Sequence, residues 1–179
     1  FRSRSFSQKA HQPWSRLIWI GVVVIFITYH LSLITSCTSI DCPVQTTVQT
    51  NYNIVDAEGK ALTLNDTLYV WSRRADGTDT LILNRGVGIS TFSLPISYQH
   101  PEDTLIFYTV NTNLESTLDT VWLKKVDIPH FESVDCAAHF FHKLTDVRST
   151  HQRIDTITIN NADVNYDTSV THINVQFAN

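Results

Sequence analysis

The sequence lacks the short motifs on which many enzyme active sites depend. No serine lies in a Gly-x-Ser-x-Gly elbow, and no glycine-rich loop of the phosphate-binding type is present. Only five glycines and five prolines occur in 179 residues. We therefore expect a non-enzymatic protein and predict no cofactor.

Methionine is also absent, and the chain begins at Phe1, so we expect the true start to lie upstream. Acidic residues are missing before Cys37, where all the charges are basic. After Cys37 nine Lys and Arg face seventeen Asp and Glu, a net charge of minus eight. An acidic domain of this kind is a poor candidate for binding nucleic acid or anionic lipid headgroups. The four basic residues of the leader are Arg2, Arg4, Lys9 and Arg16.

Residues 17–37 carry no Asp, Glu, Lys or Arg. The first eleven of them are strongly apolar, which suits the hydrophobic region of an export signal. The segment ends in Ile34-Thr35-Ser36-Cys37, which resembles the bacterial lipobox of an aliphatic residue, two small residues and a cysteine. Such signals are cut before the cysteine, whose sulfur takes a diacylglycerol, so Cys37 is the predicted lipidation site and the membrane the predicted anchor. The alternative is an uncleaved signal anchor.

Cysteine is scarce, and the count is odd: Cys37, Cys42 and Cys136. If Cys37 is acylated, two cysteines remain, and an oxidising compartment allows them to pair. A Cys42–Cys136 disulfide would close a loop of more than ninety residues, worth about 4–5 kcal/mol by loop entropy. The alternative is a pair of buried, reduced thiols.

From residue 44 onward, short runs rich in Val, Ile, Thr and Tyr alternate with turns. We predict an all-β, antiparallel two-sheet sandwich of the immunoglobulin-like kind, with a small β-barrel as the alternative. The predicted organisation is a basic and hydrophobic signal at 1–36, a lipidated cysteine and tether at 37–43, and the sandwich at 44–179. The expected strands are 44–55, 68–71, 81–83, 89–94, 105–110, 121–126, 154–159 and 172–177.

Asp-Thr precedes an apolar run five times, beginning at Asp66, Asp79, Asp103, Asp119 and Asp155. An aspartate can accept a hydrogen bond from the backbone two residues on, and a β-branched threonine can open a strand. We therefore interpret each pair as a turn that ends where a strand begins.

Two groups of residues suggest a possible metal site. Cys136, His139 and His142 would share a helical face, but on a strand positions 139 and 142 point to opposite sides, and a disulfide-bonded cysteine is no ligand. Residues 135–149 are ambiguous, and we expect one helical turn at most. The second group lies in residues 161–167, where oxygen-bearing side chains alternate as they do in a calcium-binding loop. The glycine and the bidentate glutamate of such a loop are missing. No metal is predicted, and the oxygen donors of the second group are Asn161, Asp163, Asn165 and Asp167.

Four aromatic residues, Tyr69, Trp71, Tyr108 and Trp122, fall in predicted strands. Most are expected in the core. If two or more share the outer face of a sheet, they would mark a surface for a partner.

Several segments together resemble an uncharacterised family of small Bacteroidetes lipoproteins, known only as a domain of unknown function. They are CTSIDCP at 37–43, NDT at 65–67, NRGVG at 84–88, FSLP at 92–95 and PHFESVDC at 129–136. The resemblance implies lipid anchorage and a mostly β domain. It implies no enzyme activity and no catalytic residue.

The expected function is therefore that of a lipid-anchored accessory protein that binds or assembles another protein of the cell envelope, such as an outer-membrane protein. Thr38 replaces the aspartate that retains some lipoproteins at the inner membrane, so we expect the outer membrane, with the domain facing the periplasm. The alternatives are a calcium-stabilised glycan-binding module and a metal-dependent enzyme that uses His139 and His142.

Overall fold

The computed structural model describes residues 14–33, 48–98, 100–131, 133, 136 and 138–178. The chain divides into two units, Phe1–Asp41 and Cys42–Asn179. In the first unit, helix α1 spans Trp14–Leu33, and every side chain described within it, from 18 to 29, is exposed. Within the part of the chain that the structure describes, no helix combines the length and the apolarity that a membrane crossing requires.

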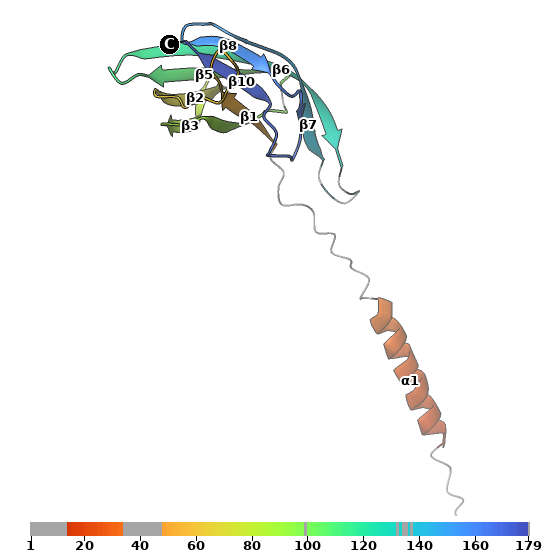
Figure 1. Cartoon of the computed structure of the whole chain (residues 1–179). Coiled ribbons are helices and arrows are strands. Elements are labelled where there is room, and N and C mark those ends of the chain that lie inside the picture. Colours follow the sequence, from red (N-terminus) through yellow and green to blue (C-terminus); the bar gives the residue numbers. More distant parts are fainter. Residues whose placement is uncertain are drawn as a thin grey trace, which may run out of the picture. The chain divides into compact units, whose positions relative to one another are not determined.

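The second unit is a β-sandwich, as predicted (Figure 1). One sheet has four strands in the order β4-β1-β10-β8, and the other has six in the order β3-β2-β5-β6-β7-β9. The strands are β1 Gln49–Ile54, β2 Thr67–Arg73, β3 Asp79–Gly86, β4 Thr91–Pro95, β5 Glu102–Val110, β6 Ser116–His130, β7 His139–Ser149, β8 Ile154–Ile159, β9 Asp163–Val164 and β10 Ile173–Phe177.

Two expectations about the strands were wrong. The sandwich is not wholly antiparallel, because β1 and β10 pair in parallel in the middle of the four-stranded sheet. Residues 139–149, for which we expected at most a helical turn, form the long strand β7, which pairs with β6 over most of its length. The segment fits a strand because burial alternates along it: His142 and Leu144 are buried, whereas Lys143 and Thr145 are exposed.

Alternation of apolar residues explains the core between the sheets. Leu68 and Val70 of β2 point inward and are fully buried. Ile54 of β1, in the opposite sheet, is buried in the same core. Successive side chains of a strand point to opposite faces, so the residues between them lie on the outer surface. Tyr52 stacks on Phe92 at 4.8 Å between ring centroids and fills the same interior.

A hairpin with Asp76-Gly77 in its turn joins β2 and β3. Gly77 has a φ of +82°, a conformation that costs glycine little. The Arg74 N–H donates to the Thr78 carbonyl at 2.8 Å, and Asp76 Oδ1 accepts from the Thr78 N–H at 2.9 Å. This geometry closes the loop at its base and sets the register of the two strands.

The Asp-Thr aspartates do not form the local turns that we expected. Asp66 binds Arg153, 87 residues away, at 2.8 Å. Asp79 pairs with Arg73 across the β2–β3 hairpin, and Asp103 lies against Lys125 of the neighbouring strand. The local turns are formed instead by other residues, of which Asp56 is one, because its carboxylate accepts from the Glu58 and Lys60 N–H groups. Four of the five aspartates therefore bind residues at least six positions away, whereas Asp155 accepts a bond from the hydroxyl of the adjacent Thr156 at 3.4 Å.

Asp119 makes the largest set of these contacts. Its side chain is buried on the inner face of β6, beside the segment that carries the chain from β7 in one sheet to β8 in the other. Its oxygens accept from the N–H groups of Gln152 and Arg153, both at 2.7 Å, and of Ile154 at 2.9 Å. The Thr150 hydroxyl donates a fourth bond at 2.8 Å. One carboxylate thus holds the crossover between the two sheets.

These contacts set the ionisation of Asp119. Burial by itself raises the pKa of the carboxyl, but the three backbone N–H groups and the Thr150 hydroxyl outweigh it and hold the pKa below its usual value. The charged form is therefore the one that the fold stabilises.

We predict that Asp119→Ala lowers the free energy of unfolding by about 3–5 kcal/mol, because three buried backbone donors lose their acceptor. Asp119→Asn is the control that retains the shape and one acceptor oxygen. Urea unfolding followed by circular dichroism measures both variants, and a loss below about 1 kcal/mol for Asp119→Ala would contradict the role.

The lowered pKa also predicts a pH dependence. The stabilisation is complete above the unfolded pKa, about 3.9, and is lost as the pH falls through the lower folded pKa, because the unfolded chain binds the proton first. The free energy of unfolding of Asp119→Asn should therefore fall less steeply than that of the wild type between about pH 5 and 2. Parallel curves would be the contrary result.

Candidate functional site

The two histidines of the zinc hypothesis do not converge. His139 and His142 both lie in β7, and their odd separation places them on opposite faces of the strand. His142 is buried and donates from Nδ1 to Asp127 Oδ1 at 2.7 Å. Burial lowers the pKa of His142, and the bond to Asp127 offsets this only in part. Among the described residues no group of three or more His, Cys, Asp and Glu could hold a metal ion.

The four oxygen donors of the calcium hypothesis lie in β9 and in the segments on either side of it. Three of them serve local turns: Asn161 Oδ1 accepts from the Asp163 N–H at 2.8 Å, and Asn165 Oδ1 accepts from the Asp167 N–H at 2.7 Å. Asp167 Oδ1 accepts from the N–H and hydroxyl of Ser169. These contacts keep the pKa of Asp167 low, chiefly through the Ser169 hydroxyl. The side-chain oxygens of Asn161, Asn165 and Asp167 therefore bind their own local backbone.

The cysteine predictions fall largely outside the described residues. Cys37, the predicted lipidation site, and Cys42 both lie there. Cys136 is described: it is half-buried in the β6–β7 connection, and its sulfur is not a free thiol. The Cys42–Cys136 disulfide stays a prediction.

The aromatic residues give the clearest surface feature. Tyr69 and Trp71 alternate with the buried residues of β2, and Tyr108 is the direct cross-strand partner of Tyr69 on β5. All three are half-buried and lie on the outer face of the six-stranded sheet. Their ring centroids are 6.0–6.1 Å apart, so the rings touch one another. The expectation that most of these residues are core was wrong, and the condition for a partner surface is met.

A shallow cleft of about 370 Å³ lies over this face. Trp71 and Tyr108 form aromatic walls, and Leu118 of β6 is 52% exposed at the side. Arg73 closes the cleft at one end, where its guanidinium makes two parallel bonds of 3.0 Å to the carboxylate of Asp79. Such a fork fixes the arginine in place and leaves its flat face available for stacking. We call Tyr69, Trp71, Arg73, Ile106, Tyr108 and Leu118 the aromatic face.

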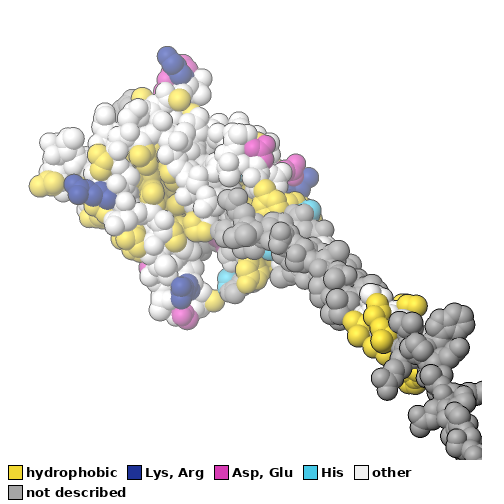
Figure 2. Space-filling model, turned by 90° about the horizontal axis from the view of Figure 1, so that it is seen from below, with side chains coloured by type: hydrophobic (Ala, Val, Ile, Leu, Met, Phe, Trp, Pro, Cys, Tyr) yellow, Lys and Arg dark blue, Asp and Glu magenta, His cyan; other side chains and the backbone are white. Residues whose placement is uncertain are grey.

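Trp122 extends the aromatic surface along β6. The guanidinium carbon of Arg148 lies 5.1 Å from the centroid of the Trp122 ring, a cation–π contact. Arg148 also binds both carboxylate oxygens of Glu102, at 3.0 and 3.1 Å. Here the ring is already covered by a paired cation, whereas Trp71 borders an open cleft. Figure 2 shows one side of the molecule, where hydrophobic side chains lie at the surface together with charged ones.

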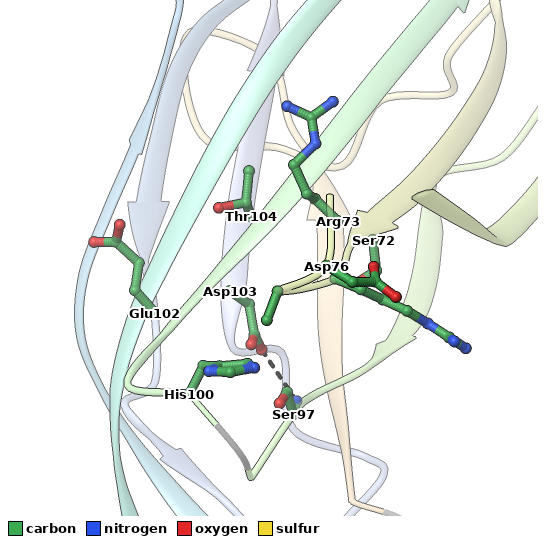
Figure 3. A pocket seen from close by; sticks show the side chains of 10 residues that line it. Ser72, Arg73, Asp76, Ser97, His100, Glu102, Asp103 and Thr104 are labelled. Atoms are coloured by element: carbon green, nitrogen blue, oxygen red, sulfur yellow. Dashed lines mark hydrogen bonds between the residues drawn. The ribbon is translucent and has the colours of Figure 1, made fainter. Parts of the chain in front are cut away.

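A second, larger cleft of about 790 Å³ lies between the β2–β3 hairpin and the segment that joins β4 to β5 (Figure 3). Its lining is mostly polar and carries charges of both signs, from Ser72, Arg73, Arg74, Asp76, Ser97, His100, Glu102, Asp103 and Thr104. The mixed charge gives no preference for a ligand of one sign. The cleft lacks the convergent set of polar groups that binding sites for small molecules usually present.

A buried ion pair supports this cleft. The Lys125 side chain is inaccessible to solvent, and its Nζ donates to the His100 carbonyl at 2.6 Å and to Asp103 Oδ1 at 3.2 Å. Asp103 Oδ2 accepts from the Ser97 N–H at 3.1 Å, the bond drawn in Figure 3. The pair therefore fixes the crossover from β4 to β5, and we assign it a structural role.

Deeper in the interior, two hydroxyl groups of β1 are buried without a hydrogen-bond partner, those of Thr50 and Tyr52. Burial raises the pKa of Tyr52, and the nearby negative charge of Asp103 raises it further. The phenol therefore stays neutral at any ordinary pH, and it faces the packed core.

The sequence signal for the aromatic face was present but ambiguous, since alternation shows that two sets of residues face opposite ways without showing which set is inside. Val70 and Tyr69 are both good core residues. Packing of the four-stranded sheet determines which of the two is inside, because it covers Val70 and leaves Tyr69 on the outer surface. Arg73, Asp79 and Leu118 were missed as neighbours because they come from three strands.

We predict that Asp103→Ala lowers the free energy of unfolding by about 3–5 kcal/mol, because it leaves the buried Lys125 charge without its partner. The double variant Asp103→Ala with Lys125→Met removes both charges and should recover at least half of the loss. Thermal and urea unfolding of the two variants beside the wild type provide the measurement. A double variant no more stable than the single one would show that the pair itself matters little.

Comparison with known proteins places the chain in a family without assigning an activity. No curated protein and no solved structure matches it. A family model described as a family of unknown function (DUF6452) matches residues 67–177, from the first residue of β2 to the last residue of β10. The expected membership of an uncharacterised family is thereby confirmed. Because the match covers more than half of the sequence, the chain belongs to the family of unknown function DUF6452.

Proposed function

We propose that this protein is a lipid-anchored, non-enzymatic accessory of the cell envelope whose β domain binds another protein through the aromatic face. The observation that carries the binding role is the cluster of Tyr69, Trp71 and Tyr108 around an open cleft on the outside of the sheet. Large aromatic side chains and arginine are the residues that most often dominate protein–protein binding energy.

The anchoring half of the proposal rests on the sequence. The basic residues before an uncharged apolar segment, followed by Ile34-Thr35-Ser36-Cys37, are typical of a lipoprotein signal. Two or more acyl chains on Cys37 would hold the domain stably at a membrane, for which we propose the outer membrane and its periplasmic side. A tether of ten residues, 38–47, would connect the lipid to the first described residue of the domain, Val48.

The aromatic face is suited to a protein partner because it is broad and shallow. A flat cleft between strands offers anchor points for one or two side chains of a partner, while the ion pairs Arg73–Asp79 and Arg148–Glu102 would lie at the rim. Rim charges of this kind contribute more to orientation and to the rate of association than to affinity.

A glycan-binding module is the second candidate, since the aromatic walls of the same cleft could stack against a sugar ring. The turn that contains Asn161 and Asp167 is not part of this cleft, and its oxygens serve its own backbone. We therefore do not attach calcium to this candidate. Binding to an array of bacterial glycans that is lost in Trp71→Ala would favour it over a protein partner.

We predict that the protein isolated from its native cells begins at Cys37 and carries a diacylglyceryl group on the sulfur. Mass spectrometry of the N-terminal peptide is the measurement. Metabolic labelling with a clickable palmitate analogue should mark the wild type and leave Cys37→Ala unlabelled. An intact chain with an unmodified Cys37 would refute the anchor.

For the partner, we predict that a photoreactive amino acid at position 118, on the aromatic face, forms a discrete protein adduct in intact cells. Trp71→Ala in the same chain should reduce that adduct at least about tenfold, since loss of an aromatic anchor at an interface costs about 2 kcal/mol or more. The matched control places the photoreactive group at position 114, which is 84% exposed in the β5–β6 turn and lies outside this face. Equal adducts from both positions, or no effect of Trp71→Ala, would count against the aromatic face.

A further inference from the structure

A second apolar surface lies at one end of the β domain, on the arm that β6 and β7 form. Pairing of β6 with β5 ends at Lys124, whereas pairing with β7 continues to His130. The last part of the β6–β7 hairpin therefore runs past β5, as Figure 1 shows. Val126, Ile128 and Phe131 of this arm are all exposed, Val126 by 56% and Phe131 by 67%.

The connection from β4 to β5 adds an aromatic pair to the same end. Tyr98 is exposed, and its ring stacks on that of Phe140 at 5.3 Å, nearly parallel. Phe140 is the cross-strand partner of Pro129. It alternates with Phe141, the partner of Ile128, and the Phe141 ring packs on His130 and Tyr166 at the edge of the core. One side of the arm thus packs in part on its own domain, whereas Val126, Ile128 and Phe131 are left largely exposed.

The chain enters the domain at this end. Gln49, at the start of β1, pairs with Pro95 at the end of β4, and the segment after Pro95 leads through Tyr98 to the start of β5. The Lys125 N–H donates to the Pro101 carbonyl at 2.9 Å, which ties that segment to the base of the arm. The first described residue of the domain, Val48, therefore lies at the end from which the arm projects.

The length of the tether then limits how far this end can be from a membrane. Eleven residue steps separate Cys37 from Val48, and even a fully extended chain spans at most about 3.6 Å for each step, or roughly 40 Å in all. If Cys42 pairs with Cys136 in the β6–β7 connection, only five steps separate the lipid from the arm, or about 18 Å. Because the tether joins the domain at this end, an acylated Cys37 would hold this end nearer to the bilayer than the opposite end of the strands.

We propose that the β6–β7 arm inserts Val126, Ile128 and Phe131 into the membrane interface and so fixes the orientation of the domain on the lipid surface. This inference rests on the acylation of Cys37 proposed above. Apolar and aromatic side chains enter the headgroup region while a nearby cation can stay at its surface. Lys143, the exposed cross-strand partner of Val126, is placed to do so.

The consequence for the aromatic face is geometric. The arm lies beyond the Lys124 end of the strands, whereas the aromatic face lies on the side of the sheet, around Trp71 and Tyr108. A domain held to the bilayer by its lipid alone could turn freely about its tether. With the arm inserted as a second point of attachment, the aromatic face would stand beside the membrane, where the exposed part of an envelope protein could reach it.

The test is lipid photocrosslinking of the full protein. It is purified from its native cells so that it keeps the N-terminus and any acylation it has there. The protein is reconstituted in vesicles of phosphatidylethanolamine and phosphatidylglycerol that contain a lipid with a diazirine in its acyl chain. After irradiation, labelled peptides are mapped by mass spectrometry. We expect label both on the acylated N-terminal peptide and on the peptide that contains Ile128 and Phe131.

The double variant Ile128→Asp with Phe131→Asp should reduce label on the arm by about tenfold or more. Its two carboxylates replace apolar side chains whose transfer from water into the membrane interface is favourable. Both residues are exposed, so the fold should survive, and circular dichroism verifies this. Leu114→Asp, a substitution at the opposite end of the strands, is the matched control and should leave the label on the arm unchanged.

The outcomes separate the two proposals. Label on the N-terminal peptide without label on the arm would overturn the insertion of the arm and leave the lipid anchor standing. A chain that is not retained on vesicles and carries no label on the arm would overturn both. Label on the arm of a chain that proves to be unacylated would refute the anchor and support the insertion.

Discussion

The fold depends on carboxylates that hold the chain where it passes from one sheet to the other. Asp119 binds the backbone of the β7–β8 crossover with three N–H bonds. Asp66, in the β1–β2 crossover, binds Arg153 of that same segment, and Asp103 with Lys125 holds the β4–β5 crossover at the other end. A sandwich must leave backbone groups unpaired wherever a strand changes sheets, and a buried N–H without an acceptor is costly. Asp119 and Asp103 satisfy such backbone groups, and Asp66 adds an ion pair with the Arg153 side chain. The two sheets are thereby fixed against each other, and their outer faces are fixed with them.

That rigidity fixes the positions of the side chains on the outer surface. Because β2, β5 and β6 are held in register, Trp71, Tyr108 and Leu118 come together from three strands around one cleft. The rings occupy fixed positions before any partner arrives, so little side-chain freedom is lost on binding. The arm of β6 and β7 is the contrasting case. It extends past β5, and its exposed residues Val126, Ile128 and Phe131 are not part of the core. It lies at the end of the domain at which the chain enters. The two surfaces divide the proposed tasks of binding and orientation between the side and the end of one domain.

Much of the architecture was readable from the sequence, and the errors have definite causes. Alternating apolar residues located eight of the strands, and Ile154–Ile159 was predicted to the residue. The strand β7 was missed because its phenylalanines and histidines fit a helix or a strand equally well when considered alone. The role of the Asp-Thr pairs was mispredicted, because an aspartate that can bond the backbone two residues ahead can also bond a distant group. Asp119 bonds distant backbone N–H groups in this way, and Asp66 bonds the Arg153 side chain. Neither metal hypothesis gained a convergent ligand set among the described residues.

By itself the sequence determined the apolar leader with its lipobox-like end, the acidic β domain and the family membership, because each follows from composition, alternation or matched residues along the chain. The tertiary structure decided which side of each strand is buried, which aspartates hold the crossovers, and that aromatic residues from β2 and β5 share an outer face. Those outcomes depend on which strands become neighbours. Pairing between residues as distant as Asp66 and Arg153 leaves no mark on the local pattern, because the free energy that selects it comes from burial and hydrogen bonding that exist only once both sheets have formed.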